Sequence, residues 1–192
     1  CSPSPWKPYE SRRTGGTHRG YWDYEGGGMC DMGQHHFDPE QWTYAKDYTS
    51  AVEITPFAPP AHPEVTGMWA WVELKYADGF RFVMESTEWG PKYDQAPIRD
   101  VSMNDLSPED QEKIKAMPDP EPLLSFGEAV KQRKKAGGHA EAAHRAACIL
   151  HLANLAIRLG RKLNYDPDKE VFVNDEEANR FLHPPMSAPW RV

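Results

Sequence analysis

Residues 68–84 have the sequence MWAWVELKYADGFRFVM, and this stretch is the strongest secondary-structure signal in the chain. Met68 to Tyr76 and Phe80 to Met84 are rich in the aromatic and β-branched residues that favour strands. The short segment Ala77-Asp78-Gly79 between them is typical of a tight turn. We therefore expect a β-hairpin here.

Three further elements are expected before this hairpin. Residues 52–57 contain strand-forming Val, Ile and Phe side chains and are followed by several prolines, which predicts a strand that ends there. A helix is expected from about Met29 to Tyr44, beginning near the three glycines at 26–28. Residues 1–25 are rich in Pro, Gly, Arg and aromatic side chains without any regular period, which predicts an ordered aromatic loop.

The part of the chain after the hairpin is expected to be connecting and helical. Residues 88–124 are polar and Pro-rich, so we expect a connection with one short helix that Ser107 caps and Pro108 begins. Residues 139–159 carry apolar side chains at steps of three and four, as in a helix that packs on a core. The other elements expected are a helix at 125–135, a short helix after Asp175, and an extended tail from His183 to Val192.

Charge and length exclude several classes of protein. The 192 residues include 22 Lys and Arg against 29 Asp and Glu, a net charge of −7 without a dense cationic segment, so nucleic acid is not an expected partner. No apolar stretch approaches the roughly 20 residues that cross a bilayer, so no membrane association is expected. We expect one domain with four parts: the aromatic loop 1–25, a helix and sheet at 26–87, the connection 88–124, and helices with a tail at 125–192.

The three cysteines, Cys1, Cys30 and Cys148, are odd in number and lie at unrelated spacings. This pattern predicts neither a disulfide framework nor a zinc site, so we expect reduced thiols and a cytoplasmic protein. A periplasmic or exported protein is the alternative if a preceding segment carries a signal.

Residues 26–38, GGGMCDMGQHHFD, carry the clearest chemistry. On a continuous helix, Asp31 and His35 fall at positions i and i+4 and share one face with Asp38. An imidazole beside a carboxylate suits proton transfer, because it titrates near neutrality and the carboxylate orients the ring. Spacing alone leaves two other interpretations open: a surface ion pair between Asp31 and His35, and a metal site that adds His36 and Asp38.

The metal interpretation is the weaker one, because adjacent side chains such as His35 and His36 project about 100° apart on a helix. We therefore expect no metal. The sequence also lacks the Gly-rich motif that binds dinucleotides, the P-loop motif, and a nucleophile elbow around any Ser or Cys. We expect no nucleotide site within these residues and no covalent hydrolysis.

Several segments together resemble the Gfo/Idh/MocA oxidoreductases. Tyr21 to Tyr24 followed by residues 26–38 is similar to the family signature GG…D-x-G-x-H…D, and Tyr76 to Phe80 is similar to the family's hairpin. The carboxy-terminal region resembles that of bacterial members in Gly160 to Leu163, Asp166-Pro167, Asp175 to Arg180 and Pro189-Trp190. The resemblance spans most of the chain and identifies it as the carboxy-terminal, substrate-side domain of such an enzyme.

The resemblance implies an α+β fold: an open, mainly antiparallel sheet with helices on one face, plus a helical and extended carboxy-terminal arm. In that family a Rossmann domain, absent from this sequence, holds NAD or NADP and supplies a catalytic lysine. The family's catalytic Asp and His correspond to Asp31 and His35. The resemblance therefore implies an NAD(P)-dependent dehydrogenase that oxidises a hydroxyl of a sugar or sugar derivative, needs a Rossmann domain or subunit as partner, and forms homo-oligomers.

Other residues are weaker candidates for substrate contact, with packing as the alternative role for each: Gln34, His36, Trp22, Trp6 and Tyr9. Two departures from the family, Met32 where many relatives carry Trp and a short polar segment after Met84, indicate that the sheet is reduced or interrupted. The alternative function is a non-enzymatic module for oligomerisation or carbohydrate binding. The retained pair of Asp31 and His35 weighs against that alternative.

Overall fold

The computed structural model describes residues 4–86, 88–94, 102–118 and 122–183. The chain divides into two compact units, one formed by Cys1–Tyr93 with Ala140–Val192 and the other by Asp94–His139. Cys1 and most of the expected extended tail lie outside the described residues.

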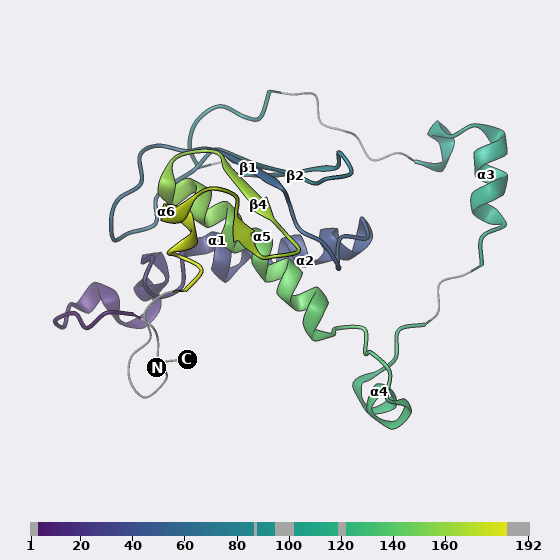
Figure 1. Cartoon of the computed structure of the whole chain (residues 1–192), viewed down its shortest axis with the longest axis horizontal. Helices are drawn as coiled ribbons and strands as arrows, with labels where there is room; N and C mark the ends of the chain where they lie inside the picture. Colours follow the sequence, from purple (N-terminus) through teal and green to yellow (C-terminus); the bar gives the residue numbers. More distant parts are fainter. Residues whose placement is uncertain (1–3, 87, 95–101, 119–121, 184–192) are drawn as a thin grey trace. The chain divides into compact units, whose positions relative to one another are not determined.

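The first unit is built on an antiparallel sheet, which confirms the expected α+β class (Figure 1). Within the described residues the sheet has five strands in the order β3-β2-β1-β4-β5. Their bounds are β1 Glu53–Phe57, β2 Trp71–Lys75, β3 Arg81–Glu85, β4 Leu163–Asp166 and β5 Val171–Phe172. Only adjacent antiparallel strands pair, so the sheet is open at β3 and β5.

The hairpin expected from residues 68–84 is confirmed as β2 and β3, with Trp71 opposite Glu85 and Lys75 opposite Arg81. Its turn needs a glycine, because Gly79 has a φ of +89°, where a side chain is strained. Asp78 closes the turn by accepting a hydrogen bond from the Phe80 N–H at 3.0 Å.

One long helix, α5 (Ala140–Leu159), covers one face of the sheet. Alternate strand residues point toward it and are buried: Ile54, Val72, Leu74, Phe82, Met84, Leu163, Tyr165 and Phe172. The helix contributes Ile149, Leu150, Leu152, Ala153, Ala156 and Ile157 to the same core. Each fully buried large aliphatic side chain stabilises the fold by about 1.5–3 kcal/mol, so this interface holds the unit together.

The single helix expected from Met29 to Tyr44 is broken in two, and that prediction is wrong. Helix α1 (Gly27–Asp31) ends at Met32, and α2 (Gly33–Thr43) begins directly afterwards. The N–H of His35 bonds to the Met32 carbonyl, three residues back, at 3.0 Å. Gly33 packs closely against α5, because a Cβ there would lie 3.0 Å from a Leu150 methyl. This close approach to α5 lies directly after the break between the two helices.

The first unit also includes the aromatic loop near the amino terminus and a short helix near the carboxy terminus. The expected aromatic loop contains two 3₁₀ turns, Ser11–Arg13 and Gly15–Gly20, and is held to the segment before β2 by a bridge between Tyr21 and Val65. Near the carboxy terminus, Asp175 caps α6 (Glu176–Asn179), as expected from the sequence.

The second unit contains two short α-helices among its described residues, and the cap predicted at Ser107 is confirmed. Ser107 accepts a hydrogen bond from the Asp110 N–H at 3.1 Å and begins α3 (Pro108–Lys115). Ser125 forms a capping box with Glu128 at the start of α4 (Phe126–Gln132). Among the described residues of the whole chain, no helix is both long and apolar enough to cross a membrane.

Candidate functional site

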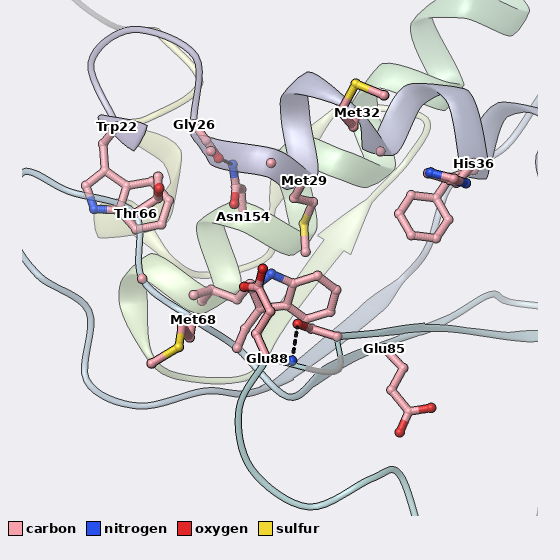
Figure 2. Close-up of a pocket in the computed structure, with 18 residues that line it drawn as sticks. Trp22, Gly26, Met29, Met32, His36, Thr66, Met68, Glu85, Glu88 and Asn154 are labelled. Carbon is pink, nitrogen blue, oxygen red and sulfur yellow. Dashed lines mark hydrogen bonds between the residues drawn. The ribbon is translucent and has the colours of Figure 1, made fainter. Parts of the chain in front are cut away.

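A pocket of about 740 Å³ lies in the first unit beside α1 and the start of α2 (Figure 2). Other described segments contribute to its wall: Trp22, Thr66–Trp69 before β2, then Glu85, Ser86 and Glu88 at and after the end of β3, and Asn154 with Ile157 of α5. These segments are distant in sequence, and the fold brings them together on one side of α1. A concave site of this size suits a small organic ligand.

Two of the three glycines at the start of α1 are required by packing. Gly26 and Gly27 have φ values of +80° and +79°, a conformation that side chains disfavour. A Cβ on Gly26 would lie 2.7 Å from the Asn154 amide nitrogen, and one on Gly27 would lie 2.7 Å from the Thr66 hydroxyl. Gly28 differs, because a Cβ there would meet no atom within 4 Å. Gly26 and Gly27 thus let two pocket residues approach the backbone.

The walls of the pocket are largely apolar: Trp22, Met29, Met32, Phe37, Met68, Trp69 and Ile157. Trp22 is fixed by a hydrogen bond from its indole N–H to the His62 carbonyl at 2.9 Å. The Arg158 guanidinium lies 5.5 Å from the centre of the same ring. Aromatic and methionine side chains offer flat, polarisable surfaces against which the C–H face of a ligand can pack.

Few polar side chains line the pocket, and they come from different elements. Asn154 donates from its amide to the Gly26 carbonyl at 2.6 Å and to the Cys30 sulfur at 3.0 Å. Figure 2 shows Glu88 directed toward Met29 and Asn154, while Glu85 is turned away. The backbone N–H of Glu88 is held by the Ser86 hydroxyl at 3.1 Å.

The two expected catalytic residues lie beside the pocket and do not line it. Asp31 forms an ion pair with Arg19 of the aromatic loop, with 3.0 Å between Nε and Oδ2. His35 is exposed on the first turn of α2. Within the described residues, no hydrogen bond or ion pair joins these two side chains, because the break at Met32 separates the helices that carry them. Their immediate neighbours in sequence, Met32 and His36, do line the pocket.

The five weaker candidates fall into two groups. Trp22 and His36 line the pocket, at opposite ends of the view in Figure 2. Gln34 is half-buried outside it, and Trp6 and Tyr9 are 88% and 83% exposed on the aromatic loop. The structure thus brings together two of these five side chains.

Several pocket residues had no signal in the sequence: Thr66, Met68, Trp69, Glu88 and Asn154. They lie in loops or on the packed helix α5, where neither spacing nor motif distinguishes them from ordinary residues. Cys30 is also close to the site, because its sulfur accepts a hydrogen bond from Asn154. Burial raises the pKa of its thiol to about 11. Its thiol therefore stays protonated near neutral pH and is a poor nucleophile.

A metal site requires several ligating side chains that lie close to one another. In the described segments, no group of three or more His, Cys, Asp or Glu side chains is placed to hold a metal ion.

Comparison with known proteins gives a family match but no significant match to a curated protein. The family model described as the oxidoreductase family, C-terminal alpha/beta domain, matches residues 1–192. The open antiparallel sheet agrees with that domain. The chain therefore belongs to the Gfo/Idh/MocA oxidoreductase family and is its carboxy-terminal α/β domain.

Proposed function

We propose that this domain is the substrate side of an NAD(P)-dependent dehydrogenase that oxidises a hydroxyl group of a sugar or sugar derivative. The observation that carries the proposal is the apolar pocket beside α1, with Asp31 and His35 at its border, in a domain of an oxidoreductase family. The nucleotide is held by a Rossmann domain that lies outside these 192 residues. The bound nicotinamide would supply the hydride acceptor for the carbinol carbon.

The pocket supplies the binding part of this function. Trp22 and Trp69 present rings that suit the C–H faces of a sugar, and Thr66, Glu88 and Asn154 present polar groups for its hydroxyls. Holding the carbinol carbon at a fixed place lowers the entropy cost of the hydride step.

Asp31 and His35 supply the proton-transfer part. The hydroxyl proton of the substrate must leave as the hydride departs, so that a carbonyl group forms and charge balances. His35 is exposed and next to the pocket residue His36, so its imidazole is available to take that proton. Asp31 is held beside the pocket by its ion pair with Arg19, and its carboxylate is the second acid–base group that we assign to the site.

The test is co-expression of this chain with a nucleotide-binding domain of the same family, followed by assay of cofactor reduction with a panel of sugars. We expect reduction of NAD or NADP by at least one sugar. Asp31→Asn and His35→Ala should each lower kcat/KM by about 10²–10⁴-fold, the usual contribution of a positioned acid–base group.

Glu40→Gln is the matched control, because Glu40 is an exposed carboxylate on α2 that does not line the pocket. It should leave kcat/KM unchanged. A complex that binds sugars without reducing cofactor would instead indicate a carbohydrate-binding module. Full activity in both Asp31→Asn and His35→Ala would contradict the assigned roles.

A further inference from the structure

Among the described residues that line the pocket, acidic side chains outnumber basic ones of permanent charge. Two of its lining residues, Glu85 and Glu88, are acidic, and no described lining residue is a lysine or an arginine. The two carboxylates differ in direction. Glu88 extends into the pocket, whereas Glu85 turns away and accepts a hydrogen bond from the Tyr93 N–H at 3.0 Å. Glu88 therefore sets the charge that a ligand meets.

Two cations near the pocket, Arg158 and Arg19, already have partners within the chain. The Arg158 guanidinium lies 5.5 Å from the ring centre of the lining residue Trp22 and 4.8 Å from that of Phe181. Arg19 is paired with Asp31 and with Glu25. Neither side chain lines the pocket, so neither is placed to pair with a charged group on a ligand.

Two more cations of the aromatic loop are also paired. Lys7 contacts Asp23 at 2.8 Å and Glu64 at 2.9 Å, and Arg13 contacts Glu64 at 3.3 Å. The lining side chain able to carry a positive charge is His36, and it does so only when protonated.

An anionic ligand would therefore meet a carboxylate without a compensating cation. Like charges several ångströms apart in a partly solvated site repel enough to weaken binding by roughly 5- to 10-fold. An uncharged polyol avoids this repulsion and gains hydrogen bonds, because a carboxylate accepts from hydroxyl groups and Thr66 and Asn154 lie in the same pocket.

We propose that Glu88 is a specificity residue that makes this pocket select uncharged hydroxyl compounds over those that carry a carboxylate or a phosphate. This inference rests on the proposed function, since it names the substrate class of the same pocket. It assigns the unmodified sugar or polyol as substrate and excludes sugar acids and sugar phosphates.

The test compares three ligands of one carbon skeleton, glucose, glucuronate and glucose 6-phosphate, by ligand-observed NMR titration of the full chain at about pH 8. We expect glucose to bind at least about 5-fold more tightly than either anion. Glu88→Gln keeps the hydrogen-bonding shape of the side chain and removes its charge. In this variant the preference for glucose over the anions should fall to less than 2-fold.

Two controls identify the source of the effect. Glu40→Gln removes one negative charge from α2 outside the pocket and should leave the preference as in the wild type. Glu85→Gln removes the carboxylate that is turned away and should change the preference less than Glu88→Gln does. If Glu40→Gln changes the preference as much as Glu88→Gln, the role of Glu88 is overturned.

Each negative result would show whether the charge selection, the role of Glu88 or the sugar site itself is wrong. Binding of glucuronate or glucose 6-phosphate as tight as that of glucose overturns the charge selection and leaves the dehydrogenase proposal standing. Selection that persists in Glu88→Gln overturns the assignment to Glu88. No binding of any of the three ligands would contradict the sugar site itself, and the charge selection with it.

Discussion

The segment from Gly26 to Phe37 contains two groups of residues that the fold treats differently. On the pocket face, a Cβ added to Gly26, Gly27 or Gly33 would lie within about 3.0 Å of another element, and Met29 is buried in the core. At the border of the pocket, Asp31 has an ion pair with a half-exposed arginine, and His35 is exposed. Packing therefore fixes the shape of the site, whereas the proposed chemistry is carried by residues that contribute little to stability.

The largest expected effect is on the pocket face. Gly27→Ala forces a side chain into a φ of +79° and places its Cβ 2.7 Å from the Thr66 hydroxyl. Strain and overpacking together should lower the free energy of unfolding by about 2–4 kcal/mol. Urea denaturation followed by circular dichroism measures this change.

Gly28→Ala is the matched control for that substitution. Its Cβ meets no atom within 4 Å, so we expect no loss of stability and a gain of at most about 1 kcal/mol from better helix propensity. Equal losses in Gly27→Ala and Gly28→Ala would show that the two glycines are not distinguished by packing.

The next effect concerns the residue that joins α5 to α1. Asn154→Ala removes the donor to the Gly26 carbonyl and leaves that buried group without its 2.6 Å bond. We expect a loss of about 1–3 kcal/mol in the free energy of unfolding. Hydrogen exchange of the α1 amides should accelerate more than that of β2 and β3. Uniform acceleration across the unit would argue against a local role of Asn154.

The burial of Cys30 predicts a pH dependence at alkaline pH. Its pKa is raised from 9.0 to about 11, so between these values the unfolded chain loses a proton that the folded chain keeps. Stability should therefore fall as pH rises through this range, by an amount on the order of 1–2 kcal/mol. Cys30→Ala should reduce the slope of stability against pH there. An unchanged slope would show that Cys30 is not protected in the folded state.

The smallest effect on stability is expected at the border of the pocket. Asp31→Asn breaks an ion pair in which the Arg19 side chain is 52% exposed, so it should change the free energy of unfolding by less than about 1 kcal/mol. Chemical denaturation beside the activity assay separates the two effects. A large loss of stability would mean that the fall in activity reports misfolding rather than chemistry.

Much of the fold follows from local signals in the sequence. The hairpin has two strand-forming stretches joined by a turn with Gly79, and α5 has a continuous apolar stripe, so both are predictable. Strands β4 and β5 were missed because they have only four and two residues, too few to show alternation clearly. They are held by pairing with β1 and with each other, which is a tertiary effect.

The site was predictable only in part. The glycines and the family signature point to the α1–α2 segment, and Trp22 and His36 do line the pocket. The break at Met32 was missed because no local pattern marks it, and the close approach of Gly33 to Leu150 beside it joins residues remote in sequence. Glu88 and Asn154 were missed for the same reason, since only the folded chain places them opposite α1.

The most direct test of the account is to locate a bound sugar with methionine methyl groups. Met29, Met32 and Met68 line the pocket, Met84 is buried in the core, and Met103 and Met117 belong to the second unit. In a chain labelled with ¹³C-methyl methionine, glucose should shift the signals of Met32 and Met68 in a saturable manner and leave Met84, Met103 and Met117 unchanged. Shifts confined to Met103 and Met117, or no shift at any methionine, would contradict the claim that the pocket beside α1 is the ligand site.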